Sequence, residues 1–376
     1  MGGNTAACVP TPGADSSIRT IAGPIDQADG PIDQAEDLAR DAVDCLPAGE
    51  LARKLALGRP LRVKLGIDPT APDIHLGHTV VLNKLRAFQD AGHVVVLIIG
   101  DFTARVGDPS GRSDTRPQLS GEQIEANART FQDQAFKVLD PERVEVRRNG
   151  EWLDMGMAEL FALLRTTTVG ALLERDDFAR RRAAQAPISM LELLYPLMQG
   201  YDSVAVHADV ELGGTDQKFN LLLGRDIQRA YGVPEQAILT MPILVGTDGE
   251  RKMSKSLGNQ IGVTEPAGEI YGKTVSLPDP ALDDWYRLLL GRRPPAELGP
   301  WEAKRLLARE LVARFHSPAD AARAEAEWDR IHRDRGEPDE IEDLAFAAGS
   351  GPVHVPGLIA EAFGLSRSDA RRLIGQ

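Results

Sequence analysis

An alternation of apolar segments between residues 61 and 99 constrains the fold more than any other feature of the sequence. Residues 61–67 have the pattern of a strand, residues 76–91 repeat apolar side chains at helical spacing, and residues 94–99 are rich in β-branched side chains. A strand, a helix and a second strand in succession form a right-handed crossover, which pairs the two strands in parallel. The sequence therefore predicts an α/β domain built on a buried parallel sheet.

The rest of the chain divides into parts of different composition. Helical patterns dominate residues 121–200, and the apolar run at residues 237–244 predicts another parallel strand. Beyond Pro266, amphipathic helical patterns replace the strand signals. The expected parts are a disordered tail over 1–35, the α/β domain over 36–265 with a helical insertion at about 121–200, an α-helical domain over 266–346, and a short final module over 353–376.

Composition narrows the classes of function. Apolar residues make up 42% and charged residues 26% of the 376, which is typical of a globular protein. The two cysteines, Cys8 and Cys45, show no metal-ligand spacing, and no apolar run reaches the roughly 20 residues of a membrane span. The net charge of −13 argues against a protein that coats nucleic acid, although a local basic patch would still bind RNA. We expect a cytoplasmic protein without membrane contact.

The first segment with chemical potential joins the predicted strand at 61–67 to the predicted helix at 76–91. It contains Asp68, Thr70 and the run His75-Leu-Gly-His78. The start of a helix offers backbone N–H donors and a positive dipole end to a phosphate, and Gly77 allows close approach. The two histidines lie three residues apart on one helix face. A metal pair or two surface histidines are the alternatives, but a zinc site needs a third ligand that the sequence does not supply nearby. We therefore predict no bound metal.

The second segment is the run Lys252-Met-Ser-Lys-Ser256, which follows the predicted strand at 237–244. Lysines supply point charges and serines supply neutral donors, which together suit a polyphosphate. Taken alone, the run is also compatible with a solvated basic loop. Its position in the same α/β domain as the histidine segment favours a phosphate-binding role.

These two segments resemble the signature elements of class I aminoacyl-tRNA synthetases. His75-Leu-Gly-His78 is similar to the HIGH element with Leu in place of Ile, and Lys252-Met-Ser-Lys-Ser256 matches the KMSKS element letter for letter. The resemblance implies a Rossmann-like parallel-sheet nucleotide-binding domain with a helical insertion, an α-helical anticodon-side domain, and a partial small RNA-binding module. Four further segments resemble the bacterial tyrosyl-tRNA synthetases: Gly66-Ile-Asp-Pro-Thr70, Gly107-Asp-Pro-Ser110, Tyr195-Pro-Leu-Met-Gln-Gly-Tyr-Asp202 and Gly213-Gly-Thr-Asp-Gln217.

The residue spacing independently favours a tyrosine site on one helix. Tyr195, Gln199 and Asp202 are spaced i, i+4 and i+7, which places them on one helix face about 10 Å long, comparable with a tyrosine molecule. Asp202 would accept a hydrogen bond from the phenol, and Tyr195, Gln199 and Asp108 would surround the ammonium group. A polar surface stripe is the alternative interpretation of this face. With the resemblance included, the expected tyrosine-binding residues are Asp68, Thr103, Asp108, Tyr195, Gln199, Asp202 and Gln217.

The resemblance also implies residues for ATP and for catalysis. Gly214 and Asp216 are expected at the ribose, although two adjacent glycines alone also occur in simple turns. The expected ATP-binding residues are His75, Gly77, His78, Gly214, Asp216 and Lys255, and the expected catalytic residues are Thr70, His75, His78, Lys252, Lys255 and Ser256. ATP is a substrate, and Mg²⁺ accompanies it without a protein site. The expected partners are L-tyrosine, ATP, tRNA-Tyr and a second copy of the chain.

Two positions depart from the pattern of many bacterial members. Those members carry a tyrosine where this chain has Lys64, and a second bacterial subgroup matches this chain better there. The final module also looks cut short after Ile374. Three alternatives stay open: a tryptophanyl enzyme of the same fold, a duplicated paralogue with a resistance or biosynthetic role, and a non-catalytic RNA-binding protein. The helical insertion, with apolar runs at 159–164 and 169–173, is the expected dimer interface.

Overall fold

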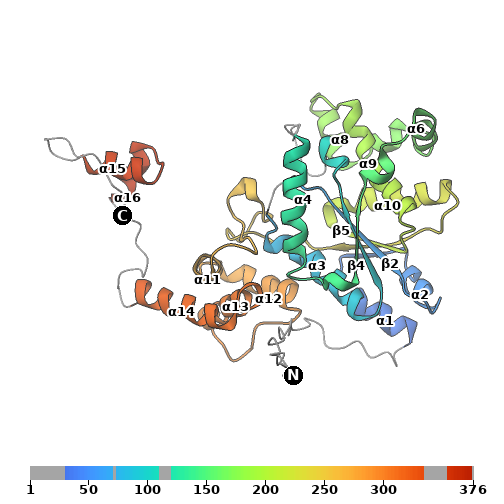
Figure 1. Ribbon diagram of the computed structural model, residues 1–376. Helices are drawn as coiled ribbons and strands as arrows, with labels where there is room; N and C mark the ends of the chain where they lie inside the picture. Colours follow the sequence, from blue (N-terminus) through green and yellow to red (C-terminus); the bar gives the residue numbers. More distant parts are fainter. Residues whose placement is uncertain (1–29, 71–72, 110–119, 334–353, 375–376) are drawn as a thin grey trace, which may run out of the picture. The chain divides into compact units, whose positions relative to one another are not determined.

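The structure is a computed structural model that describes residues 30–70, 73–109, 120–333 and 354–374 (Figure 1). The chain divides into two compact units at residue 325, and each is described by itself. Most of the expected tail, residues 1–29, lies outside the described residues. The expected tail over 1–35 extends too far, because helix α1 (Pro31–Leu38) already begins at Pro31. A proline at the first position of a helix is favourable, since its missing N–H has no partner there in any helix.

Within the described residues, six strands form one sheet in the order β1-β6-β5-β2-β3-β4. The strands are β1 (Asp44–Leu46), β2 (Arg62–Ile67), β3 (Val94–Ile99), β4 (Val144–Arg148), β5 (Val210–Gly214) and β6 (Ala237–Met241). All pairs are parallel except β1 with β6. The α/β fold class and its parallel strands at β2, β3 and β6 are confirmed. Strand β6 ends just before Pro242, which has no N–H to donate to a ladder.

The crossover between β2 and β3 is the predicted one. Helix α3 (Leu76–Asp90) contacts both β3 and β5, and its buried side chains include Leu82, Leu85 and Phe88. Five of the six residues of β3 are buried, as expected for a central strand covered on both faces. Helix α3 therefore begins at the carboxyl end of β2, where its first turn faces the edge of the sheet.

The helical insertion predicted at about 121–200 is interrupted by a strand that the sequence pattern did not predict. Helix α4 (Gly121–Ala135) is followed by strand β4, which pairs in parallel with β3 and forms the sheet edge. The sequence of β4, Val-Glu-Val-Arg-Arg, is half-buried along its whole length, so its apolar signal is weak. The helical part of the insertion begins only after β4. It consists of α5 (Gly150–Leu153), α6 (Met157–Leu164), α7 (Val169–Leu173), α8 (Asp176–Ala183) and α9 (Met190–Ala205).

Helix α9 runs unbroken through Pro196 and packs closely on α10 (Lys218–Ala230). The two helices approach at Gly200 and Gly224: a Cβ atom on Gly200 would lie 2.5 Å from Cδ1 of Ile227 and 3.2 Å from Cα of Gly224. Glycine at this position lets the two backbones approach each other. An apolar cluster that includes Phe178 and Leu197 adjoins the contact. This packing fixes the face of α9 that carries the predicted tyrosine-binding residues.

Most of the remaining described helices follow β6 in the sequence. Helices α11 (Ala267–Val275), α12 (Leu282–Leu290), α13 (Pro300–Phe315) and α14 (Pro318–His332) occupy the region expected to be helical, and Trp285 and Tyr286 are fully buried there. Two short helices, α15 (Val355–Ala362) and α16 (Arg367–Ile374), lie in the final module. Helix α2 (Glu50–Leu55) and the 3₁₀ turns at Thr103–Arg105, Pro141–Arg143, Thr215–Gln217, Lys255–Leu257 and Asp279–Ala281 complete the described elements. None of the helices that the structure describes has both the length and the apolar character needed to cross a bilayer.

Candidate active site

The predicted site residues gather at the carboxyl edge of the parallel sheet. Asp68 follows β2, Thr103 follows β3, and Gly214 ends β5. The chain places β3 on one side of β2 and β5 on the other, so the strand order reverses at β2. In open α/β sheets, ligands bind outside the carboxyl ends of the strands at such a reversal. The topology therefore indicates this edge as the place for a substrate.

Asp68 connects β2 to helix α9. Its Oδ1 accepts a hydrogen bond from the Thr103 hydroxyl at 2.6 Å, and its Oδ2 accepts one from the Tyr195 hydroxyl at 2.9 Å. Burial, and secondly the Asp68 charge, raise the pKa of Tyr195 well above its ordinary value of 10. Tyr195 is therefore a neutral donor, and Asp68 is held from two directions.

Asp202 lies two turns further along α9 and is 3% exposed. The indole Nε1 of Trp152 donates to Oδ1 at 2.8 Å, and Nδ2 of Asn149 lies 3.5 Å from Oδ2. Burial raises the pKa of the Asp202 carboxyl to about 7, against the opposing positive charge of Lys64. A carboxylate has about four acceptor sites, so Asp202 can accept a further hydrogen bond from a hydroxyl donor such as a phenol.

Asn149 joins these two ends of the site, and no motif in the sequence points to it. Its Nδ2 also donates to the Thr103 hydroxyl at 2.9 Å. One hydrogen-bonded chain, which we call the tyrosine chain, thus runs from Tyr195 through Asp68, Thr103 and Asn149 to Asp202. Asn149 and Trp152 follow β4, the strand that the sequence pattern did not reveal.

Gln199 belongs to a second series of hydrogen bonds. Its Oε1 accepts from Nδ2 of Asn220 at 2.7 Å, and the same amide lies 3.2 Å from Oε1 of Gln217. Gln217 in turn donates to Oδ2 of Asp108 at 2.8 Å. The structure therefore brings Asp108, Gln199 and Gln217 together as predicted. Asn220 and Arg175 were missed: Arg175 donates to Oδ1 of Asn220 at 3.1 Å and lies 3.7 Å from Asp108.

The two histidines meet at the start of α3. His75 precedes the helix, its backbone N–H donates to Nδ1 of His78 at 3.2 Å, and the two ring centroids are 3.9 Å apart. Burial lowers the pKa of His78 to about 4, and burial together with His78 lowers the pKa of His75 to about 2. Both rings are therefore neutral at physiological pH and offer N–H donors rather than charge. Nδ1 of His75 is buried without a hydrogen-bond partner among the described residues.

The lysine-containing loop is attached to this helix start. The N–H of Gly77 donates to Sδ of Met253 at 3.3 Å, and the N–H of Leu76 donates to the Ile261 carbonyl at 2.9 Å. Lys255 pairs with Asp73 at 3.1 Å, and Ser256 shares a hydrogen bond with Ser254. The loop therefore places Lys255 beside the segment that leads into α3.

Asp216 and Gly214 lie at the end of β5. A Cβ atom on Gly214 would lie 2.7 Å from Oδ1 of Asp216, so a larger residue would displace that carboxylate. Burial raises the pKa of Asp216, and the charge of Lys252 opposes the shift. Lys252 is thus near enough to act on Asp216. Thr70 stays close to Asp68, whose carbonyl accepts from the Thr70 N–H at 2.7 Å.

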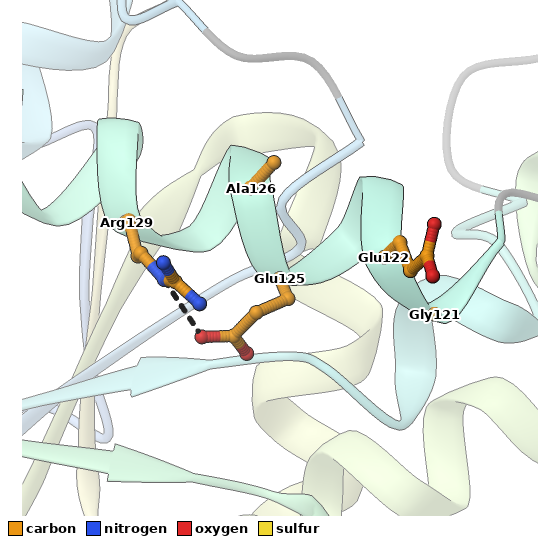
Figure 2. Close-up of a pocket in the computed structure, with 5 residues that line it drawn as sticks. All are labelled: Gly121, Glu122, Glu125, Ala126 and Arg129. Atoms are coloured by element: carbon orange, nitrogen blue, oxygen red, sulfur yellow. Dashed lines mark hydrogen bonds and ion pairs between the residues drawn. The ribbon is translucent and has the colours of Figure 1, made fainter.

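A separate hollow runs along α4 and is lined by Gly121, Glu122, Glu125, Ala126 and Arg129 (Figure 2). Figure 2 shows Glu125 and Arg129 paired on the helix surface, with a distance of 3.1 Å between them. No predicted site residue lines this hollow. Within the described ranges, no three His, Cys, Asp or Glu side chains group as a metal ion would require.

Comparison with known proteins identifies the family of the chain. A family model described as tRNA synthetases class I (W and Y) matches residues 56–333. The tyrosine–tRNA ligase of Moorella thermoacetica is 52% identical over 358 residues, which cover 90% of this chain and 86% of that protein. Tyrosine–tRNA ligase 2 of Vibrio vulnificus is 50% identical over 353 residues, with 90% and 88% covered. The crystal structure of an Archaeoglobus fulgidus tyrosyl-tRNA synthetase, 23% identical, shares the fold with a TM-score of 0.64 over 78% of this chain and 99% of that one. The chain belongs to the class I tRNA synthetases and, within them, to the tyrosine–tRNA ligases.

Proposed function

We propose that this chain joins L-tyrosine to tRNA-Tyr in two steps at the carboxyl edge of its sheet. The first step makes tyrosyl-adenylate and pyrophosphate from tyrosine and ATP, and the second transfers the tyrosyl group to the 3′ end of the tRNA. The observation that carries the proposal is the tyrosine chain, which ends in two polar groups of different character. Asp202 at one end suits a phenol, and Asp68 with Tyr195 at the other suits an ammonium group.

The bound tyrosine would lie along the face of α9. Its hydroxyl would donate to the Asp202 carboxylate, which also accepts from two donors of the insertion, Trp152 and Asn149. Its ammonium group would be held by oxygen atoms of Asp68 and Asp108, with Tyr195 and Gln199 beside it. Phenylalanine would leave Asp202 buried and short of a donor, which costs roughly 1–3 kcal/mol. Gln217 would place the carboxylate of the substrate toward the nucleotide.

ATP would occupy the start of α3 and the end of β5. The N–H groups of the first helical turn, the neutral His75 and His78, and the absence of a side chain at Gly77 suit the phosphates. Thr70 would lie on the same side, and Gly214 with Asp216 would hold the ribose. Lys252, Lys255 and Ser256 would close over the pyrophosphate, since the ion pair of Lys255 with Asp73 is exposed and easily exchanged for a phosphate.

The chemistry of the first step needs no general base. The carboxylate of tyrosine is already an anion, and one of its oxygens attacks the α-phosphorus of ATP while the bond to the β-phosphate oxygen breaks. Pyrophosphate leaves with the Mg²⁺ that arrives as part of the substrate. The protein's contribution is positioning and the stabilisation of charge on the transferring phosphoryl group. In the second step a ribose hydroxyl of the terminal adenosine attacks the carbonyl carbon of the adenylate, and AMP leaves.

The macromolecular partners would be the tRNA and a second copy of the chain. Helices α11 to α14 would serve the anticodon side of the tRNA, and the final module, whose helix α16 carries Arg367, Arg371 and Arg372, would bind RNA. A second copy of the chain would cover the insertion. Helix α6 packs on α9, and large apolar side chains are exposed on both, among them Met157 at 63%, Phe161 at 51% and Met190 at 71%. A cytoplasmic location stays a prediction.

Charging of tRNA tests the proposal against its rivals. Purified chain, ATP, tRNA-Tyr and radiolabelled tyrosine should yield acid-precipitable tyrosyl-tRNA, whereas labelled tryptophan with tRNA-Trp should yield none. Adenylate formation without transfer to tRNA would favour a paralogue with another acceptor. Absence of both steps would favour a non-catalytic RNA-binding protein.

A further inference from the structure

Lys64 is a fully buried lysine in the middle of β2. Its Nζ lies 2.8 Å from Oε1 of Glu211, 2.8 Å from the Ser203 hydroxyl and 2.9 Å from the carbonyl oxygen of Gln199. A lysine ammonium group has three N–H donors, and these three acceptors use them all. Lys64 therefore has no donor left for a substrate.

The partner of Lys64 is equally buried. Glu211 faces Lys64 in the register of β2 with β5, and it is 1% exposed. Its Oε2 accepts from the Ser203 hydroxyl at 3.1 Å and from the amide of Gln236. Removing two charges from water is costly, and well-packed apolar residues in their place are often as stabilising. Stability alone therefore does not account for this pair.

The pair holds one particular turn of α9. The carbonyl of Gln199 and the side chain of Ser203 are one helical turn apart, and both accept from the same ammonium group. Asp202 lies within that turn. This turn therefore carries Gln199 and Asp202, two of the residues expected to bind tyrosine. Lys64 attaches the turn to the sheet.

We propose that Lys64, together with Glu211, is a positioning residue that fixes the Gln199–Asp202 turn of α9 and thereby sets the preference for tyrosine over phenylalanine. This inference rests on the proposed tyrosine activation. It also explains the departure at this position: where many bacterial members have a tyrosine expected to touch the phenol, Lys64 acts through the helix instead of by contact.

The electrostatics agree with the geometry. Asp202 is hydrogen-bonded to Trp152 of α5 and Asn149 after β4, and it interacts electrostatically with Lys64 of β2, Glu211 of β5 and Tyr195 of α9. Burial raises the pKa of Asp202, the Lys64 charge lowers it, and the Glu211 charge raises it. Lys64 therefore favours the ionised carboxylate, which is the stronger acceptor for a phenol.

The test compares tyrosine with phenylalanine in ATP–pyrophosphate exchange by the double variant K64M/E211M. Removing both charges together leaves no unpaired buried ion, so the variant should fold. We expect the ratio of kcat/KM for tyrosine to that for phenylalanine to fall at least tenfold, through a higher KM for tyrosine. S203A, which removes one partner of Lys64, should shift the ratio in the same direction by less and serves if the double variant fails to fold.

Lys54→Met is the matched control. Lys54 is buried in an ion pair with Asp209, 3.5 Å away, just before the amino end of β5, away from the site residues. Its loss should lower the melting temperature and leave the ratio unchanged. An unchanged ratio in folded K64M/E211M or S203A would overturn the inference while leaving tyrosine activation intact. A wild-type chain that does not activate tyrosine would overturn both.

Discussion

The N–H of Gly77 donates a hydrogen bond to the sulfur of Met253, 3.3 Å away and 176 positions later in the chain. This bond attaches the lysine-containing loop to the first turn of α3, between the two segments expected to hold the phosphates. Met253 is buried, whereas Lys252 and Lys255 on either side of it are exposed. The loop is therefore held at its centre, and its lysines are free to follow a ligand.

Gly77→Ala should impair the use of ATP. A Cβ atom there would lie 3.0 Å from two ring atoms of His75, so the ring must move by about a few tenths of an ångström, and 3.5 Å from Cβ of Met253, which is an ordinary contact. We expect kcat/KM for ATP in pyrophosphate exchange to fall about tenfold or more, with tyrosine affinity unchanged. Gly268→Ala in α11, where the added methyl group meets nothing within 4 Å, is the control. Equal ATP kinetics in the two variants would refute the packing argument.

Lys252→Ala and Lys255→Ala should each lower kcat with little change in the Kd for tyrosine. The lysines are expected to act on the pyrophosphate as it leaves, so their loss removes an interaction made in the transition state. Single-turnover adenylate formation and tyrosine titration separate the two quantities. Lys273→Ala, which removes a lysine paired with Glu265 outside the site, should change neither. Weakened tyrosine binding with a normal kcat would show that the role is assigned wrongly.

The pH dependence of kcat/KM for tyrosine should follow the ionisation of the Asp202 carboxyl group. Its pKa of about 7 means that the carboxyl is protonated below pH 7 and ionised above it. We expect kcat/KM for tyrosine to decline as pH falls through 7, because the anionic acceptor is lost. The two histidines, with pKa values of about 2 and 4, do not titrate in that range. Asp202→Asn should have a lower kcat/KM and a flat profile between pH 6 and 8; a profile that keeps its slope would assign the titration to another group.

Phe161→Glu should dissociate the proposed homodimer. The side chain is 51% exposed on α6, and a charge there would be buried against a second copy. Sedimentation equilibrium should show a dimeric wild type and a monomeric variant at the same concentration. Leu57→Glu, at a position after α2 where the side chain is 59% exposed, should stay dimeric. A monomeric wild type would remove this part of the account.

Gly200→Ala should destabilise the domain. The added methyl group would meet Ile227 at 2.5 Å and the backbone of Gly224 at 3.2 Å, so α9 and α10 must separate. Overpacking of this kind costs roughly 1–3 kcal/mol in the free energy of unfolding. Urea unfolding followed by circular dichroism measures the change, with Gly268→Ala as the reference. A variant as stable as the reference would contradict the close packing of the two helices.

Strong local patterns account for the parts of the fold that the sequence predicted. Strand β3 is six apolar residues in succession, and α3 repeats its apolar positions at helical spacing, so both were found within about a residue. Strand β4 was missed because its Glu and Arg residues are half-buried at the sheet edge, where burial does not demand apolar side chains. Strand β1 has only three residues and takes its place from pairing with β6, almost 200 positions later.

The site residues also separate into those that local patterns predict and those that only the folded chain reveals. Residues inside recognisable runs, such as His75, His78 and Lys255, were placed near one another as expected. Asn149 and Trp152 were missed because only the folded chain shows their partner, Asp202, which lies about 50 positions away. A single asparagine or tryptophan carries no local sign of such a contact, and both follow the strand that the pattern concealed.

ATP–pyrophosphate exchange with each of the twenty amino acids tests the central claim most directly. The account predicts exchange that depends on tyrosine, with phenylalanine and tryptophan far weaker, because only tyrosine places a hydroxyl donor at Asp202 and an ammonium group at Asp68. Exchange with another amino acid in preference to tyrosine, or with none, would contradict it.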